Sequence, residues 1–187
     1  MPRRLLLALA SALALAACGG DASTPAAPPK ARPLARELAS AARAIEERRF
    51  AEGRALAEAH LAQHPEDGQA AFLIGLAHTY ADNHGAARPW LERAREREPG
   101  LVAVHALLGA CLFRLGELAA ARESYSTYLA LAPGDPKGHY GLGLIDLDET
   151  KLAAAAERFR QALALFAAIE RADPAQASAR RAERAEC

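Results

Sequence analysis

The feature that most constrains this sequence is a 34-residue period. Three prolines and three glycines recur at this interval: Pro65, Pro99, Pro133, Gly75, Gly109 and Gly143. A fixed period of this length is typical of stacked supersecondary units, because one such unit cannot bury its apolar faces alone. The period divides the chain into four units, residues 34–67, 68–101, 102–135 and 136–169.

The residues inside each unit resemble the tetratricopeptide repeat, a hairpin of two helices. The third unit shows the pattern most fully, with Gly109, Gly116 at the turn, Ala121, Tyr125 and Pro133. Small residues let the two helices approach, a large residue fills the gap beside them, and proline ends the second helix because it has no N–H. The resemblance implies an all-α fold, a short right-handed superhelix of about four such hairpins over residues 34–171 plus a C-terminal helix.

Three units depart from this pattern. The first has Ala41 where glycine is usual and Ala57 and His60 at two other repeat positions, which suits a terminal cap. In the fourth unit Ala167 stands where the repeat has proline, so we expect the second helix to continue to about Arg171. A polar capping helix or tail, residues 172–187, is expected to follow. In the second unit Pro89 falls inside an expected helix; it fits if that helix begins late, near Ala86, and otherwise implies a kink.

The N-terminal region reads as a targeting segment followed by a linker. Two arginines precede 13 mostly apolar residues, a stretch too short to span a membrane and typical of a signal peptide, here residues 1–17. The residues LAAC, ending at Cys18, resemble the bacterial lipobox, which implies that Cys18 is lipidated and anchors the mature chain to a membrane. The alternative is an ordinary signal peptide with an incidental cysteine. Residues 18–33, rich in proline and alanine, are expected to be a flexible linker.

Charge and sorting residues restrict where such a chain works. Removing residues 1–17 takes away two of the 23 basic residues and none of the 23 acidic ones, so the mature chain stays close to neutral. A nucleic-acid-binding protein usually carries a basic excess, so we expect no nucleic-acid partner. The residue after the lipidated cysteine is Gly19 rather than aspartate. The lipoprotein resemblance therefore implies the bacterial cell envelope, at the outer membrane and facing the periplasm.

Residue patterns that would indicate catalysis are absent from the sequence. It contains no HExxH, no GxSxG and no phosphate-binding glycine loop, so we expect no enzyme activity and no cofactor. His60 and His64 are four residues apart and could share a helix face as metal ligands, but with no evident third ligand we expect a solvated pair and no metal site. Cys111 is expected to be a small buried apolar residue, and Cys187 an exposed thiol. Whether either cysteine forms a disulfide stays open.

A candidate binding surface follows from the repeat resemblance. In this family the first helix of each hairpin lines the inner, concave face. The family's lining positions, carried onto this sequence, give a partner-binding groove made of Phe72, Leu76, Tyr80, Phe113, Arg114, Lys137, Tyr140 and Leu144. A groove of this kind can take an extended peptide or an amphipathic helix. The alternative is that the aromatic residues pack against neighbouring repeats. The lysines and asparagines with which some chaperone-binding members hold a terminal carboxylate are absent.

These features together predict a membrane-anchored scaffold. Its partners would be proteins or peptides of the cell envelope, and assembly of an envelope complex would be one such role. The alternative is a structural lipoprotein associated with peptidoglycan, which would bind isolated cell wall without a protein partner. A third hypothesis is a metal protein that uses His60 and His64. The sequence leaves the partner, the pathway and the oligomeric state open.

Overall fold

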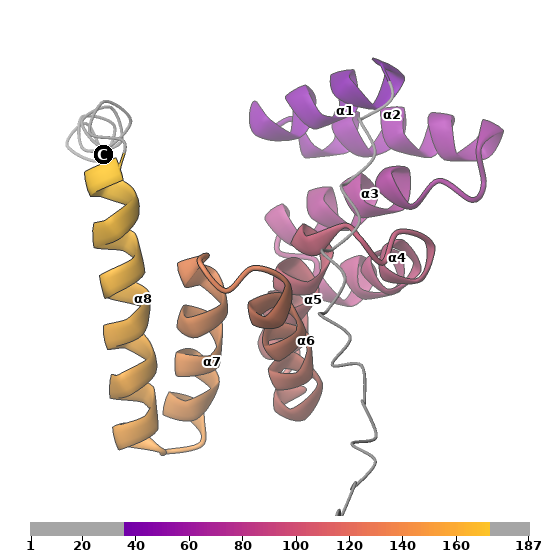
Figure 1. Cartoon of the computed structure of the whole chain (residues 1–187). Helices are drawn as coiled ribbons and strands as arrows, with labels where there is room; N and C mark the ends of the chain where they lie inside the picture. Colours follow the sequence, from indigo (N-terminus) through magenta and orange to yellow (C-terminus); the bar gives the residue numbers. More distant parts are fainter. Residues whose placement is uncertain (1–35, 173–187) are drawn as a thin grey trace, which may run out of the picture.

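The computed structural model describes residues 36–172, which form eight α-helices and no strand (Figure 1). The helices are α1 (Arg36–Glu46), α2 (Phe50–Gln63), α3 (Gly68–Tyr80), α4 (His84–Arg97), α5 (Val102–Arg114), α6 (Leu118–Leu131), α7 (Pro136–Asp148) and α8 (Leu152–Ala172). The predicted all-α fold is confirmed. The expected signal peptide, Cys18, the linker 18–33 and the tail beyond Ala172 lie outside the described residues.

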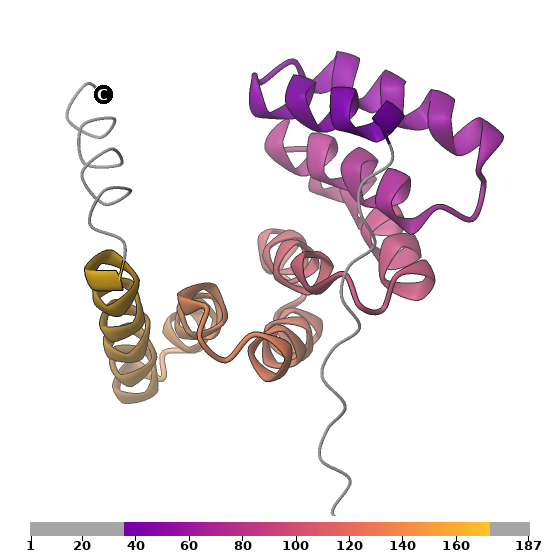
Figure 2. The ribbon, with the colours of Figure 1, turned by 45° about the horizontal axis from the view of Figure 1, so that its top comes forward.

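Consecutive helices pair as four hairpins, α1/α2, α3/α4, α5/α6 and α7/α8, which stack one on the next. The stack curves, so that α8 stands at one end and α1–α4 at the other (Figures 1 and 2). The odd-numbered helices contact one another along the stack, α1 with α3, α3 with α5 and α5 with α7. None of the helices between residues 36 and 172 has both the length and the apolarity needed to cross a membrane.

The 34-residue period reappears in the backbone of the four hairpin turns. Arg48, Asp82, Gly116 and Thr150 are 34 residues apart, and each has a φ between 58° and 79°. A residue in this left-handed region ends the first helix of each hairpin, as it commonly does at helix C-termini. Only one of the four is glycine, so three turns place a side chain in a conformation that costs an L-residue roughly 1–2 kcal/mol.

Aspartates begin the first helix of two hairpins. The Asp67 carboxylate accepts hydrogen bonds from the backbone N–H groups of Gln69 (2.9 Å) and Ala70 (3.2 Å) at the start of α3. Asp135 accepts one from the N–H of Lys137 (2.9 Å) at the start of α7, where Pro136 occupies the first turn. Such caps satisfy N–H groups that have no partner within the helix, and each contributes about 1 kcal/mol.

The packing inside each hairpin follows the size pattern read from the sequence. In three units a glycine of the first helix faces a large side chain of the second, the pairs being Gly75–Leu91, Gly109–Tyr125 and Gly143–Phe159. A Cβ added at these glycines would stand 2.6, 3.0 and 2.7 Å from the facing side chain. The glycines therefore allow the close helix approach that the repeat requires.

The structure confirms the predicted extent of the last helix but not the predicted start of the helix that contains Pro89. The expected extension of the last helix is confirmed, since α8 runs to Ala172. The late start of the helix that contains Pro89 is wrong: α4 begins at His84, and Pro89 lies inside it, beyond the first turn. Proline there removes one backbone hydrogen bond, and the packing of Leu91 and Ala94, both fully buried, holds the helix together around it.

Candidate partner-binding groove

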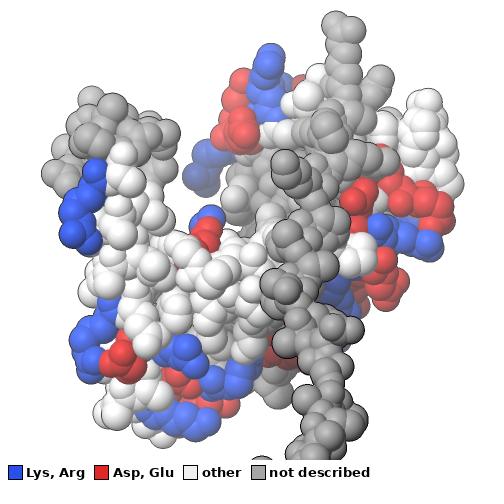
Figure 3. Space-filling model, in the orientation of Figure 1, with Lys and Arg blue, Asp and Glu red and all other residues white. Residues whose placement is uncertain are grey.

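An open groove of about 330 Å³ lies where α3, α5 and α7 come together. Its lining consists of apolar and aromatic side chains with a single charged one: Phe72, Leu76, Tyr80, Ala103, Ala106, Leu107, Ala110, Tyr125, Tyr128, Lys137 and Tyr140. The face of the molecule between α8 and the other helices is largely uncharged, and charged side chains gather toward its edges (Figure 3).

The shape of the groove comes from the size of its residues. Ala103, Ala106 and Ala110 follow at intervals of three and four residues along α5, so they share one face of that helix and leave space above it. Tyr80 from α3 and Tyr140 from α7 also line the groove and are 57% and 50% exposed. Exposed aromatic side chains beside a floor of small residues form the kind of surface on which interface hot spots concentrate.

Five of the eight predicted groove residues lie in this lining: Phe72, Leu76, Tyr80, Lys137 and Tyr140. The other three lie outside it. Phe113 is half-buried against the core that contains Leu91 and Leu142. Arg114 is exposed and pairs with Asp82 at 3.1 Å, and Leu144 is half-buried.

Tyr125 and Tyr128 were not among the predicted groove residues, and they reach the groove from α6, the second helix of its hairpin. Tyr125 extends between two helices, because a Cβ at Gly109 would stand 3.0 Å from its ring and one at Gly141 only 2.3 Å. Tyr128 lies against Gly138, where an added Cβ would stand 3.3 Å from Cδ1 of the tyrosine ring. Gly138 and Gly141 of α7 are the sequence feature that could have predicted these two tyrosines, because side chains at those positions would separate α6 from the groove.

Electrostatics around the groove centre on the start of α7. Burial, together with a hydrogen bond from its hydroxyl to the Asp135 carboxylate, raises the pKa of Tyr128 above its ordinary value. The same carboxylate caps α7, and its Oδ2 lies 3.7 Å from the ammonium of Lys137. Burial raises the pKa of Tyr125 to about 12, so its hydroxyl stays protonated at neutral pH.

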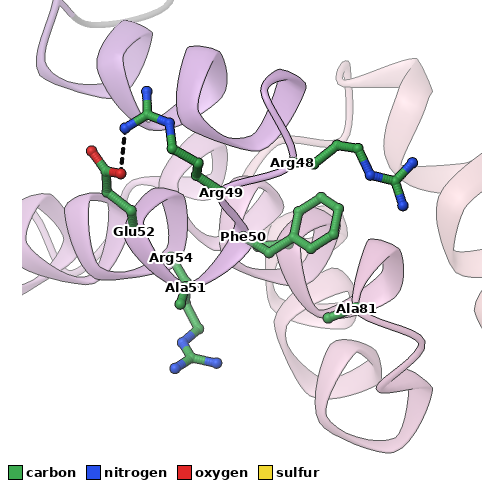
Figure 4. Close-up of a pocket in the computed structure, with 8 residues that line it drawn as sticks. Arg48, Arg49, Phe50, Ala51, Glu52, Arg54 and Ala81 are labelled. Carbon is green, nitrogen blue, oxygen red and sulfur yellow. Dashed lines mark hydrogen bonds and ion pairs between the residues drawn. The ribbon is translucent and has the colours of Figure 1, made fainter.

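A second hollow, of about 530 Å³, lies beside the α1–α2 turn (Figure 4). Arg49 is held there between the carboxylates of Glu47 and Glu52. Arg48 points away from that pair and lies over the Phe50 ring, 5.8 Å from its centre. Arg48 and Arg49 therefore already have partners within the protein, an arrangement typical of charged side chains at a solvent-exposed helix end.

The candidate metal ligand His60 and the cysteine Cys111 both lie in the packed interior of the fold. His60 is not solvated as expected, because it is buried and its Nε2 lies 3.1 Å from Oδ2 of Asp67. Within residues 36–172 no group of three or more His, Cys, Asp or Glu side chains could hold a metal ion. Cys111 is fully buried, as expected; its thiol donates to the His84 carbonyl, and burial raises its pKa to about 11.

Comparisons with known proteins identify the repeat that builds this fold. Two family models described as tetratricopeptide repeat match residues 38–102 and 79–145, which together span more than half of the chain. No curated protein sequence matches the chain.

Several solved structures share the fold. MamA MSR-1 is 24% identical over 69% of this chain and 74% of its own, with a TM-score of 0.61, and MamA AMB-1 is 24% identical over 71% and 78%, with 0.63. A chain of the Cut9–Hcn1 hetero-tetramer of the APC/C is 22% identical over 69% of this chain and 25% of its own, with 0.63.

These matches support a protein–protein interaction scaffold, and repeats of this kind are generally non-catalytic. The hairpins, their 34-residue period and the two matching models agree, and the chain belongs to the tetratricopeptide repeat family.

Proposed function

We propose that this protein is a membrane-anchored scaffold of the bacterial cell envelope that holds a segment of a partner protein in its groove. The observation that carries the proposal is the exposure of Tyr80 and Tyr140 beside the alanine floor of α5. Part of each ring packs within the fold, Tyr80 against Phe50 with ring centres 6.1 Å apart and Tyr140 against Phe159 with ring centres 5.8 Å apart. Burying the exposed remainder of each ring against a partner would stabilise a complex by roughly 1–3 kcal/mol.

Anchoring at the membrane is proposed from the sequence alone. Cys18 follows a short apolar stretch, and 17 residues separate it from the first residue of α1, Arg36. A linker of this length, rich in proline, reaches several tens of Å at about 3 Å per residue. Lipidation of Cys18 would therefore hold the groove away from the bilayer, within reach of partners at the outer membrane and in the periplasm.

The groove is tested by capture from detergent-solubilised envelopes. The bait is the full-length protein, compared with a Tyr80→Ala/Tyr140→Ala variant. Because both side chains are about half exposed, the variant should keep its helicity. The matched control is Leu152→Ala/Leu163→Ala, which truncates two side chains of α8 that are 67% and 66% exposed and lie outside the groove.

We expect chemical crosslinking to recover specific proteins with the wild-type and control baits and to lose them with the tyrosine variant. Recovery of the same proteins by all three baits would contradict binding in the groove. Recovery of cell-wall material alone would favour a structural, peptidoglycan-associated role instead. The anchor is tested separately: Cys18→Ser should move the protein from the membrane fraction to the soluble fraction, and an unchanged membrane fraction would refute lipid anchoring.

A further inference from the structure

The polar groups of the groove show which partner chemistry it fits. Lys137 is the one charged residue among the eleven that line it, and the lining contains no carboxylate. An ammonium group can only donate hydrogen bonds, and it favours a negative charge nearby. The groove therefore accepts a carboxylate more readily than a cation.

Tyrosine hydroxyls add to this preference. Within residues 36–172 the hydroxyls of Tyr80, Tyr125 and Tyr140 make no hydrogen bond, although all three residues line the groove. The hydroxyl of Tyr128 is already used by Asp135. Three hydroxyls and one ammonium are thus left to meet polar groups of an occupant.

The charge of Lys137 is only weakly compensated by the protein itself. Its nearest carboxylate, on Asp135, stands 3.7 Å away. That carboxylate also accepts hydrogen bonds from the Lys137 backbone N–H and from Tyr128. The Lys137 side chain is 69% exposed, and an ion pair of this length and exposure contributes little. The ammonium remains available to a partner.

The volume limits how much of a partner can enter. About 330 Å³ lies at the lower end of the range for pockets that bind small ligands, which is room for a few side chains rather than a whole domain. The apolar rings and the alanine floor would surround large apolar side chains of such a segment. The start of α7, where Lys137 lies, would meet its charged residue.

We propose that the groove binds an internal segment of a partner protein in which an aspartate or glutamate side chain accompanies large apolar residues, the carboxylate meeting Lys137. This inference rests on the proposed function, since it specifies the partner of the same groove. It commits to a side-chain carboxylate within a chain.

The experiment is a selection from a random 12-residue peptide library displayed with the peptide C-terminus fused to the carrier. That fusion removes the terminal carboxylate, so any acidic preference comes from side chains. The targets are the full-length wild-type protein, Lys137→Glu, Tyr80→Ala/Tyr140→Ala and Lys151→Glu. Lys151 lies at the α7–α8 turn and is 59% exposed, so its variant matches the net charge of Lys137→Glu at a site away from the groove.

Folding of the charge variant is checked first by circular dichroism. Glutamate in the first turn of a helix interacts favourably with the helix dipole, so Lys137→Glu should keep α7 intact. We expect peptides with Asp or Glu beside large apolar residues from the wild type and from Lys151→Glu. Lys137→Glu should bind those peptides about tenfold more weakly at low salt, with the difference shrinking as salt rises, and should select Lys or Arg in their place.

Two outcomes overturn the inference in distinguishable ways. Peptides that need the tyrosines but show no acidic preference, or the same preference in Lys137→Glu, would refute the carboxylate partner and leave the groove function intact. Enrichment that is equal on the wild type and on the tyrosine variant would refute both the partner chemistry and the proposed function of the groove.

Discussion

A single added methyl group at Gly141 should disturb both the stability of the repeat stack and the shape of the groove. Gly141 lies in α7 and faces the Tyr125 ring of α6. A Cβ at this position would stand 2.3 Å from Cε1, 2.4 Å from Cζ and 2.6 Å from Cδ1 of the tyrosine. The ring has little room to retreat, because its opposite edge lies so close to the α5 backbone at Gly109 that even a Cβ added there would stand only 3.0 Å from the ring.

Two opposing effects set the size of the change in Gly141→Ala. Alanine is a better helix former than glycine by about 1 kcal/mol in a helix interior. Overpacking a tight core typically costs about 1–3 kcal/mol, and an overlap this severe belongs at the upper end of that range. The free energy of unfolding should therefore fall by about 1–2 kcal/mol. The displaced ring of Tyr125 should also narrow the groove and weaken peptide binding.

Urea unfolding followed by circular dichroism measures the stability change. The matched control is Gly85→Ala in α4, where an added Cβ meets nothing within 4 Å, so this variant should be as stable as the wild type or slightly more stable. Equal stability of Gly141→Ala and Gly85→Ala would refute a clash between a Cβ at position 141 and the Tyr125 ring. A double-mutant cycle with Tyr125→Ala gives a second check, because removing the ring should abolish most of the penalty at Gly141.

Three further predictions concern other parts of the structure. Thr150→Gly should raise the free energy of unfolding by about 0.5–1 kcal/mol, because Thr150 has a φ of 61° that glycine adopts more easily. The reverse change at the equivalent turn, Gly116→Thr, should lower the free energy of unfolding. Equal urea unfolding midpoints for the two variants would contradict this. Burial, with a smaller contribution from Arg95, lowers the pKa of His105 in the folded protein below the ordinary 6.5. The contribution of neutral His105 to the free energy of unfolding should therefore be fully present above pH 6.5 and be lost as the pH falls from 6.5 through the lower folded-state pKa. His105→Gln should flatten this pH dependence, measured by urea unfolding. Cys111, in a variant whose other two cysteines are serine, should resist iodoacetamide at pH 8 until urea unfolds the protein, and rapid native labelling would show that its thiol is accessible.

Much of the fold could be predicted because the repeat is encoded locally. Gly75 and Leu91 already specify how one hairpin closes, since a small and a large residue on facing helices leave a single close packing. The same spacing in the following units fixes the stack. The start of α4 could not be predicted in the same way. Proline lowers helix propensity, but the burial of Leu91 and Ala94 outweighs that local effect.

The groove could be predicted only in part, for a geometric reason. Lining positions transferred from the first helices gave Tyr80 and Tyr140, because these side chains point along the inner face. Tyr125 contributes from a second helix, and it does so because Gly141 leaves a path between α6 and α7. Such a path depends on three helices at once, which no pattern within one helix reveals.

The most direct test of the account is a contact made in the cell. A photo-crosslinking amino acid is placed at Ala106 on the groove floor and, as a control, at Ala119, an exposed position of α6 that does not line the groove. The account predicts that light produces a specific crosslinked protein from position 106 only, and that Tyr80→Ala/Tyr140→Ala removes it. Crosslinks of equal strength from position 119, or crosslinks at 106 that persist without the two tyrosines, would contradict a scaffold that binds its partner in this groove.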